Sequence, residues 1–406
     1  MACDVAQMPR TTMTMSNGGR IAEHLSVGLL ARCYPRERIR QILERSGLQS
    51  KRVRDLPAEA LVYYVIALGM FMAVSTGEVL RCLIEGLQWL GGGSGKLKVA
   101  GKVAISQARS RMGAAPLKAL WQESVSLLGL EGEPGCFYRG LRLVAIDGST
   151  LDVPDTEENE AFFGRQRSRR GRSAFPQLRF VSLCECGPHA IFAVRMAAYA
   201  TSETTLAHEL VGELQPAMLC LADRLYPSFA LWQKAAESKA ALLWRVRAKT
   251  ILPAEKVLED GSYLSRIYPS QKAQRKRKGG IVVRVIDYQL EGVEGADPLY
   301  RLITTLHDCH EAPAAELAAL YPQRWEMETL LDELKTHLRG RQVVLRSKTP
   351  SLIEQEFYGM MLAHRAVRTL MSEAAQYQHL DPDRLSFTHS LRVIRRKLAA
   401  APTISP

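Results

Sequence analysis

Arg324, Glu328 and Lys335 place a carboxylate between two cations, at spacings of four and seven residues. On an α-helix, which turns about 100° per residue, these three side chains would lie within an arc of roughly 40°. The carboxylate could then hold a metal ion that faces a polyphosphate, with the cations contacting the phosphates. The simplest alternative is an ion pair between Arg324 and Glu328 within the helix, which needs no ligand.

An apolar stripe beside these residues predicts which face of the helix meets the protein core. It has four members at helical spacing, namely Met327, Leu331, Leu334 and Leu338. Glu328 would therefore lie at the edge of the core. Glu326 and Glu333 would point to the opposite, solvated side.

Two aspartates follow apolar segments that we expect to be buried strands. The segment 141–146 ends before Asp147, and the segment 217–222 ends before Asp223. An aspartate after a strand is often only a turn residue or a helix cap. Together with Glu328, however, these acids supply the hard oxygen ligands that Mg²⁺ prefers. Two such ions about 3.5–4 Å apart could neutralise a phosphoryl group, activate a hydroxyl and stabilise the leaving oxygen.

The composition favours a polyanionic partner. The chain has 406 residues, 47% apolar content and a formal charge of +12, which allows two or three domains and favours nucleic acid over an anionic membrane surface. The longest apolar run, residues 61–74, is shorter than the ~20 residues that span a bilayer. Residues 1–20 lack the apolar core of a signal peptide. We therefore expect a cytoplasmic protein whose eight cysteines are reduced.

Cys184, Cys186 and His189 form one cluster of potential zinc ligands. They lie around the turn of a hairpin that we expect over 178–186 and 190–197. A zinc site would need a fourth ligand, and no residue stands at a suitable spacing. The sequence therefore favours thiols without a metal.

The order of expected elements predicts a mixed α/β sheet covered by helices. Residues 21–130 show helical periodicity, strands begin at residue 141, and a late helix carries Glu328. Within the helical region, the basic segment 102–113 has features of a helix-turn-helix, with Ser106 as a helix N-cap. We favour DNA contact for this segment over a solvated helix face.

Three motifs carry a family resemblance. The segment VAIDGSTLDVPDT contains Asp147, and LCLADRLYPSFALW contains Asp223 followed by an arginine. The pattern Tyr-x2-Arg-x3-Glu-x6-Lys is met by Tyr321, Arg324, Glu328 and Lys335. In these motifs, and over most of residues 35–370, the chain resembles bacterial insertion-sequence transposases of the DDE class, in the insertion sequence 4 family.

This resemblance implies a metal-dependent transposase. It implies that Asp147, Asp223 and Glu328 are catalytic and bind two divalent ions, normally Mg²⁺ with Mn²⁺ as a substitute. A metal-activated water would cut DNA at the terminal inverted repeats, and the exposed 3′-OH would then attack target DNA. Relatives pass through a hairpin at the transposon end, for which Trp325 and Tyr300 are candidate base-stacking side chains.

Double-stranded DNA is the partner that the resemblance implies, both at the transposon ends and at the target. Tyr321, Arg324 and Lys335 would contact its backbone near the cleaved end. We assign further phosphate contacts to two basic loops and to the residue after the second aspartate, namely Arg165, Arg169, Arg170, Lys276, Arg277 and Arg224. Solvated loops, or for Arg224 an ion pair, are the alternative. A homodimer is expected because two ends must be joined.

The implied fold is a ribonuclease-H-like core with a β-rich insertion, preceded by a helical N-terminal domain and followed by C-terminal helices. We expect a loose tail at 1–20, a helical and candidate DNA-binding domain at 21–130, the core at 136–240 and 307–373, the insertion at 241–306, and a C-terminal helical segment at 374–406.

Two other functions would use the same residues differently. A nuclease or resolvase on this core would share the three acids without needing the Tyr–Arg–Glu–Lys pattern. A catalytically silent, transposase-derived DNA-binding protein would not need all three acids. A two-carboxylate glycosidase leaves the basic charge unexplained. The expected transposase would be associated with the bacterial nucleoid while it is bound to DNA.

Overall fold

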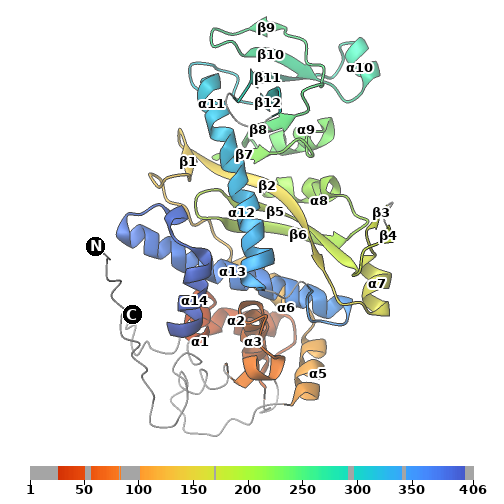
Figure 1. The fold of residues 1–406 in the computed structure, drawn as a ribbon, viewed down its shortest axis with the longest axis vertical. Helices are drawn as coiled ribbons and strands as arrows, with labels where there is room; N and C mark the ends of the chain where they lie inside the picture. The colour runs from red at the N-terminus through yellow and green to blue at the C-terminus, as the bar shows by residue number, and fades with distance from the viewer. Residues whose placement is uncertain are drawn as a thin grey trace, which may run out of the picture.

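Helices cover both faces of one large sheet in the middle and upper parts of the molecule (Figure 1). The computed structural model describes residues 26–50, 56–81, 83, 101–168, 171–290, 297–340 and 344–397.

Ten strands among the described residues make up this sheet. Nine follow the order β6-β5-β2-β7-β8-β12-β11-β10-β9, and β1 pairs with β2 beside them. Their bounds are β1 (Phe137–Tyr138), β2 (Leu141–Asp152), β5 (Gln177–Glu185), β6 (Ala190–Ala198), β7 (Met218–Ala222), β8 (Ala241–Val246), β9 (Lys256–Val257), β10 (Tyr263–Ile267), β11 (Ile281–Tyr288) and β12 (Tyr300–Thr304). A separate ribbon joins β3 (Arg167–Ser168) to β4 (Gly171–Arg172).

The central strands are apolar on both sides because both faces of the sheet are covered. β7 is buried throughout and pairs in parallel with β2 and with β8. Along β2, Val144 and Ile146 belong to one apolar core, whereas Leu143 and Ala145 belong to another on the opposite face. Strands buried on both faces have near-continuous apolar sequences. This explains why the segments 141–146 and 217–222, before the two aspartates, are almost entirely apolar.

Short helices connect the parallel strands. α8 (Glu203–Leu210) and the 3₁₀ turn η2 (Val211–Glu213) lead from β6 to β7, and α9 (Phe229–Glu237) leads from β7 to β8. Their apolar side chains belong to the same core as Val144 and Ile146. Two further helices lie between strands, namely α7 (Glu157–Phe163) and α10 (Gln271–Arg275).

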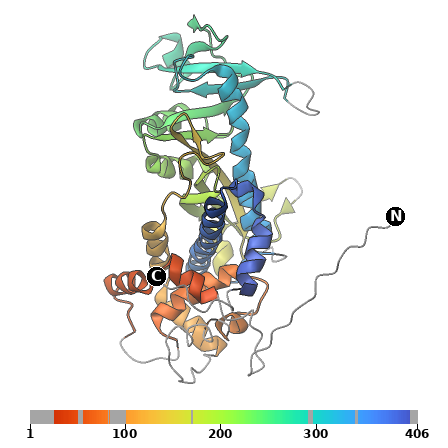
Figure 2. The same ribbon diagram turned by 90° about the vertical axis from the view of Figure 1, so that its left-hand side faces the viewer.

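The other face of the sheet packs on α13 (Pro350–Gln378), which contacts β6 on one side and α3 on the other. The N-terminal helices gather beneath α13 (Figures 1 and 2). Their bounds are α1 (Ser26–Cys33), α2 (Arg36–Arg45), α3 (Ala58–Met70), α5 (Lys102–Met112) and α6 (Ala115–Ser124). The 3₁₀ turn η5 (Pro382–Arg384) and α14 (Phe387–Lys397) follow α13.

A helical rod runs along the sheet and down to α13 in both views (Figures 1 and 2). It changes its winding three times: α11 (Ala314–Leu320) is followed by a 3₁₀ segment, η3 (Tyr321–Trp325), by α12 (Glu326–Asp332), and by a π-helical segment, η4 (Glu333–Leu338). This rod carries the charged stripe of the sequence analysis. Its path is therefore what places those side chains.

The mixed α/β sheet predicted from the sequence is confirmed, as is the hairpin, now β5 and β6. The β-rich segment after the second aspartate also forms as predicted. Its strands extend the core sheet through β8 and β12, which pair antiparallel. The domain boundaries themselves stay a prediction.

One prediction for the N-terminal helices is wrong. Ser106 is not an N-cap, because α5 already begins at Lys102 with Gly101 as its cap. Arg109 is only 7% exposed, and its guanidinium donates hydrogen bonds to Gln355 and Ser347. It therefore holds α5 to α13. Lys102 and Arg111 of the same segment are exposed, so DNA contact by the segment 102–113 stays a prediction. Among the described helices, none combines the length and apolar character of a membrane span.

Helices α3 and α13 cross at a contact made possible by two glycines. A Cβ added at Gly359 would lie 2.7 Å from the Val65 carbonyl oxygen, and one at Gly69 would lie 2.9 Å from Met360 Cα. Backbone atoms occupy the space at each position. The two helices can approach this closely only without side chains there.

We expect Gly359→Ala to lower the free energy of unfolding by roughly 1–3 kcal/mol, because the added methyl would force the helices apart. Gly212→Ala is the matched control, since a Cβ at Gly212 meets nothing within 4 Å. Denaturant titration of the two variants measures the difference. Equal stability of both variants would contradict the close helix contact.

Candidate active site

Asp147 and Asp223 lie side by side where β7 ends. In the parallel pairing of β2 with β7, the last matched residues are Ile146 and Ala222, so the next residue on each strand is an aspartate. The expectation that both aspartates terminate strands is wrong for Asp147. β2 continues to Asp152 because β5 pairs with it along that whole stretch, whereas β7 stops at Ala222.

Arg324 connects the helical rod to this pair. Its Nη2 lies 2.8 Å from Oε1 of Glu328, and its Nη1 lies 3.7 Å from Oδ2 of Asp147. The guanidinium is nearly buried, whereas the Glu328 side chain is 60% exposed. The ion pair within the helix that the sequence left open is therefore present. The same guanidinium also faces the first aspartate.

Tyr321 and Lys335 fix the rod to the strands. The Tyr321 hydroxyl donates to the carbonyl oxygen of Ala222, at 3.2 Å, and Lys335 Nζ donates to Oγ of Ser149, at 3.0 Å. Tyr321 is 5% exposed, so it faces the protein interior. Its expected contact with DNA is not what this geometry favours; it positions the rod over the end of β7.

The prediction that Glu326 and Glu333 point to solvent is wrong. Glu333 is 5% exposed and pairs with Arg368 of α13, and Glu326 contacts His189. The π-helical winding at Glu333–Leu338 departs from the 100° step on which the prediction relied. In addition, α13 and η5 cover this side of the rod. The apolar stripe, by contrast, is buried as predicted.

Burial makes Asp147 hard to ionise. The pKa of Asp147 is raised to about 6, chiefly by burial; Asp223 and Glu203 add to the rise, while the Gly148 N–H and Arg324 oppose it. The Gly148 N–H donates to Asp147 Oδ1 at 2.8 Å. The site therefore concentrates negative charge that its own cation only partly offsets.

Glu203 is a fourth carboxylate that the sequence did not indicate. It begins α8 behind Ser202, and a Cβ added at Gly148 would lie 3.0 Å from its Oε2. Burial raises the pKa of Glu203; Arg179 opposes the rise and Asp223 adds to it. In the sequence, Ser202 and Glu203 show only the start of a helix. Their nearness to Asp147 depends on how α8 packs on β5 and β6.

Tyr226 adds an unpaired hydroxyl to the same region. The residue is fully buried, and its hydroxyl has no hydrogen-bond partner in the described structure. Burial raises the pKa of Tyr226 well above its usual value, and Asp147, Glu203 and Asp223 each add to the rise. Buried polar groups are normally satisfied. Oxygen ligands, excess negative charge and an orphan hydroxyl together fit a site for hydrated divalent cations.

The predicted DNA contacts differ in how free their side chains are. Arg165 is held by Asp155 and Glu160 and is largely buried. Arg224 pairs with Asp297 at 3.3 Å and stays exposed. Lys276 and Arg277 are exposed at the end of α10. Arg169 and Arg170 lie outside the described residues.

The two candidate aromatics stand in different settings. Trp325 is 55% exposed on the rod. Tyr300 stacks on Tyr288 with ring centroids 5.2 Å apart, and the Arg245 guanidinium lies 4.2 Å from its ring centre. Both rings stay candidates.

The suggested cysteine cluster does not come together with His189. Cys184 and Cys186 are buried, and Cys184 Sγ lies 2.8 Å from the sulfur of Met327. The His189 ring instead contacts Glu326. The six cysteines in the described part of the chain are free thiols.

Two family models match the chain. One, the insertion element 4 transposase N-terminal region, matches residues 24–122, and the other, the transposase DDE domain, matches residues 138–365. The transposase InsG for insertion sequence element IS4 of Escherichia coli K12 is 29% identical over 95% of this chain and 84% of its own length. The putative transposase InsZ of the same organism is 29% identical over 50% of this chain and 65% of its own length.

Among solved structures, the piggyBac transposase in a synaptic complex with hairpin DNA covers 94% of this chain and 83% of its own chain. Its TM-score is 0.46 at 14% identity, so this likeness is distant.

The raised pKa of Asp147 predicts a pH-dependent effect on stability. The folded state holds the Asp147 proton more tightly than the unfolded chain, whose pKa is near 3.8, so the cost of ionising Asp147 grows as the pH rises from about 4 to about 6. Without divalent metal, the free energy of unfolding of Asp147→Asn should therefore exceed that of the parent by roughly 3 kcal/mol at pH 8. At pH 5 the difference should be about half as large.

Denaturant titration at both pH values, in chelator, measures this difference. Asp332→Asn is the control, because Asp332 makes only an exposed pair with His337 and should change stability little. An advantage of Asp147→Asn that is the same at both pH values would contradict the buried, ionised carboxylate.

Proposed function

The chain belongs to the DDE transposases, in the insertion element 4 branch, and we propose that Asp147, Asp223 and Glu328 are the acids with which it cuts and joins DNA. The observation that carries this proposal is the meeting of three distant segments. Parallel strands bring the two aspartates together, and Arg324 links Glu328 to Asp147.

We propose that the three acids hold two Mg²⁺ ions, or Mn²⁺ in their place. When bound, such ions activate a water or a 3′-hydroxyl and stabilise the leaving oxygen of a phosphodiester. Arg324 keeps the exposed Glu328 side chain directed toward the aspartates. Tyr321 and Lys335 fix the rod against β7 and β2, so that the acid on the helix and those on the strands keep their spacing.

The proposed reaction has two steps at the same site. In the first, a water oxygen bonds to phosphorus at the transposon end, and the bond from phosphorus to the 3′ oxygen breaks, leaving a 3′-OH. In the second, that 3′-OH bonds to a phosphorus in target DNA and displaces a target 3′ oxygen. The acids and Arg324 serve both steps by orienting the reacting groups. A hairpin intermediate would use Trp325 or Tyr300 as a stacking surface.

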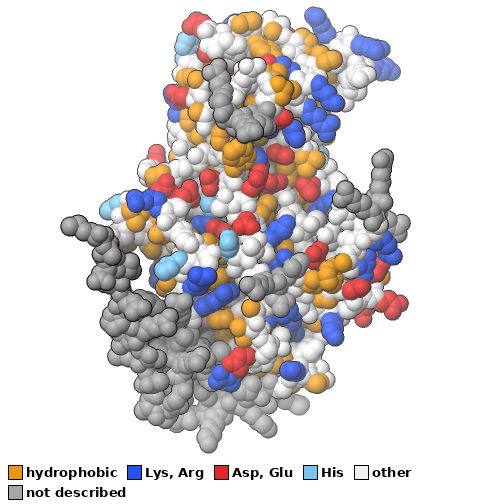
Figure 3. Space-filling model, in the orientation of Figure 1, with side chains coloured by type: hydrophobic (Ala, Val, Ile, Leu, Met, Phe, Trp, Pro, Cys, Tyr) orange, Lys and Arg blue, Asp and Glu red, His pale blue; other side chains and the backbone are white. Residues whose placement is uncertain are grey.

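We propose that DNA lies across the face that carries the exposed cations. Lys and Arg side chains gather at the end of the molecule formed by α10 (Figure 3), where Lys276 and Arg277 are exposed. Arg224, next to Asp223, and Lys335, on the rod, lie closer to the acids. Arg165 is a weaker candidate because its own chain already supplies two carboxylates. Phosphate contacts of this kind give salt-dependent binding.

A homodimer in a paired-end complex is part of the proposal, because joining two transposon ends requires two active sites. Bound to DNA, the protein would associate with the bacterial nucleoid.

We expect Asp147→Asn, Asp223→Asn and Glu328→Gln each to slow Mg²⁺-dependent cleavage of terminal-repeat DNA by roughly 10³-fold, because each removes a charge that the transition state needs. DNA binding should survive, since all exposed cations remain. Asp332→Asn, on the same helix as Glu328, should cleave normally. Gel assays of cleavage, strand transfer and binding on the same DNA measure all three activities.

Normal cleavage by the three variants would overturn the assignment of the acids. Cleavage without strand transfer by the parent protein would indicate a nuclease or resolvase instead. Binding without either activity in the parent would indicate a catalytically silent DNA-binding protein.

A further inference from the structure

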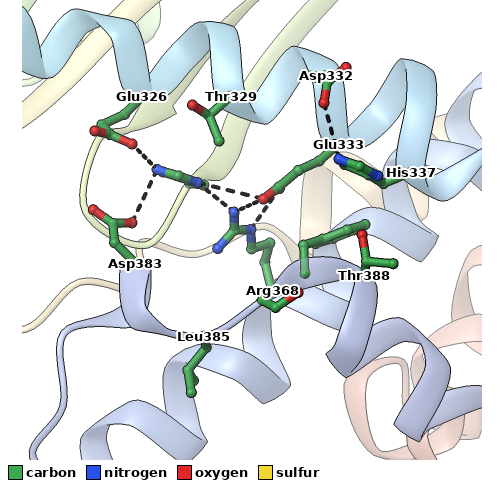
Figure 4. Close-up of a pocket in the computed structure, with 12 residues that line it drawn as sticks. Glu326, Thr329, Asp332, Glu333, His337, Arg368, Asp383, Leu385 and Thr388 are labelled. Atoms are coloured by element: carbon green, nitrogen blue, oxygen red, sulfur yellow. Dashed lines mark hydrogen bonds and ion pairs between the residues drawn. The ribbon is translucent and has the colours of Figure 1, made fainter.

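A second group of metal-binding side chains lies behind the helix that carries Glu328. His189 comes from the turn between β5 and β6, Glu326 from the start of α12, and Asp383 from η5. One ligand atom from each residue lies within 4.8 Å of the other two. The three residues line a pocket of about 300 Å³, and Figure 4 shows Glu326 and Asp383 turned toward the same point.

The geometry centres on one ring nitrogen. Nε2 of His189 lies 2.6 Å from Oε2 of Glu326 and 3.3 Å from Oδ1 of Asp383. The 3.3 Å separation is that of neighbouring ligands of a tetrahedral zinc ion, which sit about 2.0–2.2 Å from the metal. The 2.6 Å separation is a hydrogen bond, which would have to open by about 1 Å to admit the ion. Three protein ligands would leave the fourth position to a water in the pocket.

The far side of the imidazole faces an arginine and a carboxylate. Arg368 donates to Nδ1 of His189, and Oε1 of Glu333 lies 3.8 Å from the same nitrogen. In this arrangement Nδ1 accepts, so the ring proton lies on Nε2, which donates to Glu326. A metal ion at Nε2 would replace that proton, and the ring proton would move to Nδ1, where Glu333 could accept it once Arg368 turns away. A carboxylate behind a ligating histidine is the usual second partner. His189 itself is 3% exposed, so its ring is held in place.

The charged residues around the pocket leave two carboxylates without a full compensating positive charge. Arg368 offsets Glu333, which also contacts His364 at 3.2 Å, and Asp332 pairs with His337 at 3.1 Å. Among the residues that the structure describes, the His189 ring is the shared partner of Glu326 and Asp383. Burial raises the pKa of Asp383 to about 6, His189 opposes the rise and Glu326 adds to it. A divalent ion would supply the positive charge that these two carboxylates lack.

We propose that His189, Glu326 and Asp383 bind one divalent transition-metal ion, best matched by Zn²⁺, at a site separate from the Mg²⁺ pair of the active site. A nitrogen ligand favours such an ion over Mg²⁺, which prefers oxygen alone. The site joins the segment after α13 to α12, two residues from Glu328. A bound ion would therefore hold α12, the helix that carries Glu328, in place. The proposal does not depend on the catalytic role assigned to Glu328.

The test uses the full chain with the active-site acids neutralised as Asp147→Asn, Asp223→Asn and Glu328→Gln. We expect this triple variant to bind one Zn²⁺ per chain by calorimetry in millimolar Mg²⁺, and to give the visible absorption of Co²⁺ with a nitrogen ligand. Adding Asp383→Asn or His189→Gln should weaken Zn²⁺ binding by at least about 100-fold. Adding His310→Gln, at an exposed histidine, should leave binding unchanged.

Absence of Zn²⁺ binding in the triple variant would overturn the proposal, leaving an ion-pair cluster that needs no metal. Unchanged binding after both substitutions would overturn it as well, because the ion would then sit elsewhere. Melting curves in chelator show whether each variant folds. Asp383→Asn lies on a short surface turn, so it keeps the test decisive if His189→Gln fails to fold.

Discussion

The parallel pairing of β2 with β7 determines where the acidic groups of this protein meet. Both strands are apolar on both faces, and the last matched pair, Ile146 with Ala222, is followed on each strand by an aspartate. Placing two carboxylates there is costly because burial opposes ionisation. Arg324, reaching Asp147 from the rod, offsets part of this cost, and the remaining negative charge suits divalent cations.

The rod beside the sheet makes polar contacts on two opposite sides. Arg324 and Lys335 point to β2, whereas Glu326 and Glu333 point to the β5–β6 turn and α13. Regular α-helical winding would not give this division; the 3₁₀ and π segments at either end of α12 rotate the flanking residues. Glu328 lies between Glu326 and Glu333 on the rod. A shift in the packing of α13 or η5 against the rod would therefore also move Glu328, so the C-terminal helices are physically connected to the acids.

Local patterns in the sequence were enough to predict the buried strands, and they singled out the two aspartates and Glu328, whose role stays a proposal. Each depends on apolar runs or helical spacing within a short segment, and the family motifs pointed to the same residues. Glu203 could not be found in this way, because its place beside Gly148 depends on the packing of α8. Glu333 was misjudged for a related reason: its partner, Arg368, is distant in sequence, and no periodicity reveals it.

Iron-directed cleavage of the protein tests the central claim most directly. Fe²⁺ bound in place of Mg²⁺, with ascorbate and peroxide, generates radicals that cut the backbone beside the metal. If β2 and β7 form one cation site, mass spectrometry should find cuts close to both Asp147 and Asp223, and excess Mg²⁺ should suppress both together. Cuts near only one of these aspartates, or cuts at both that Mg²⁺ does not suppress, would contradict the account.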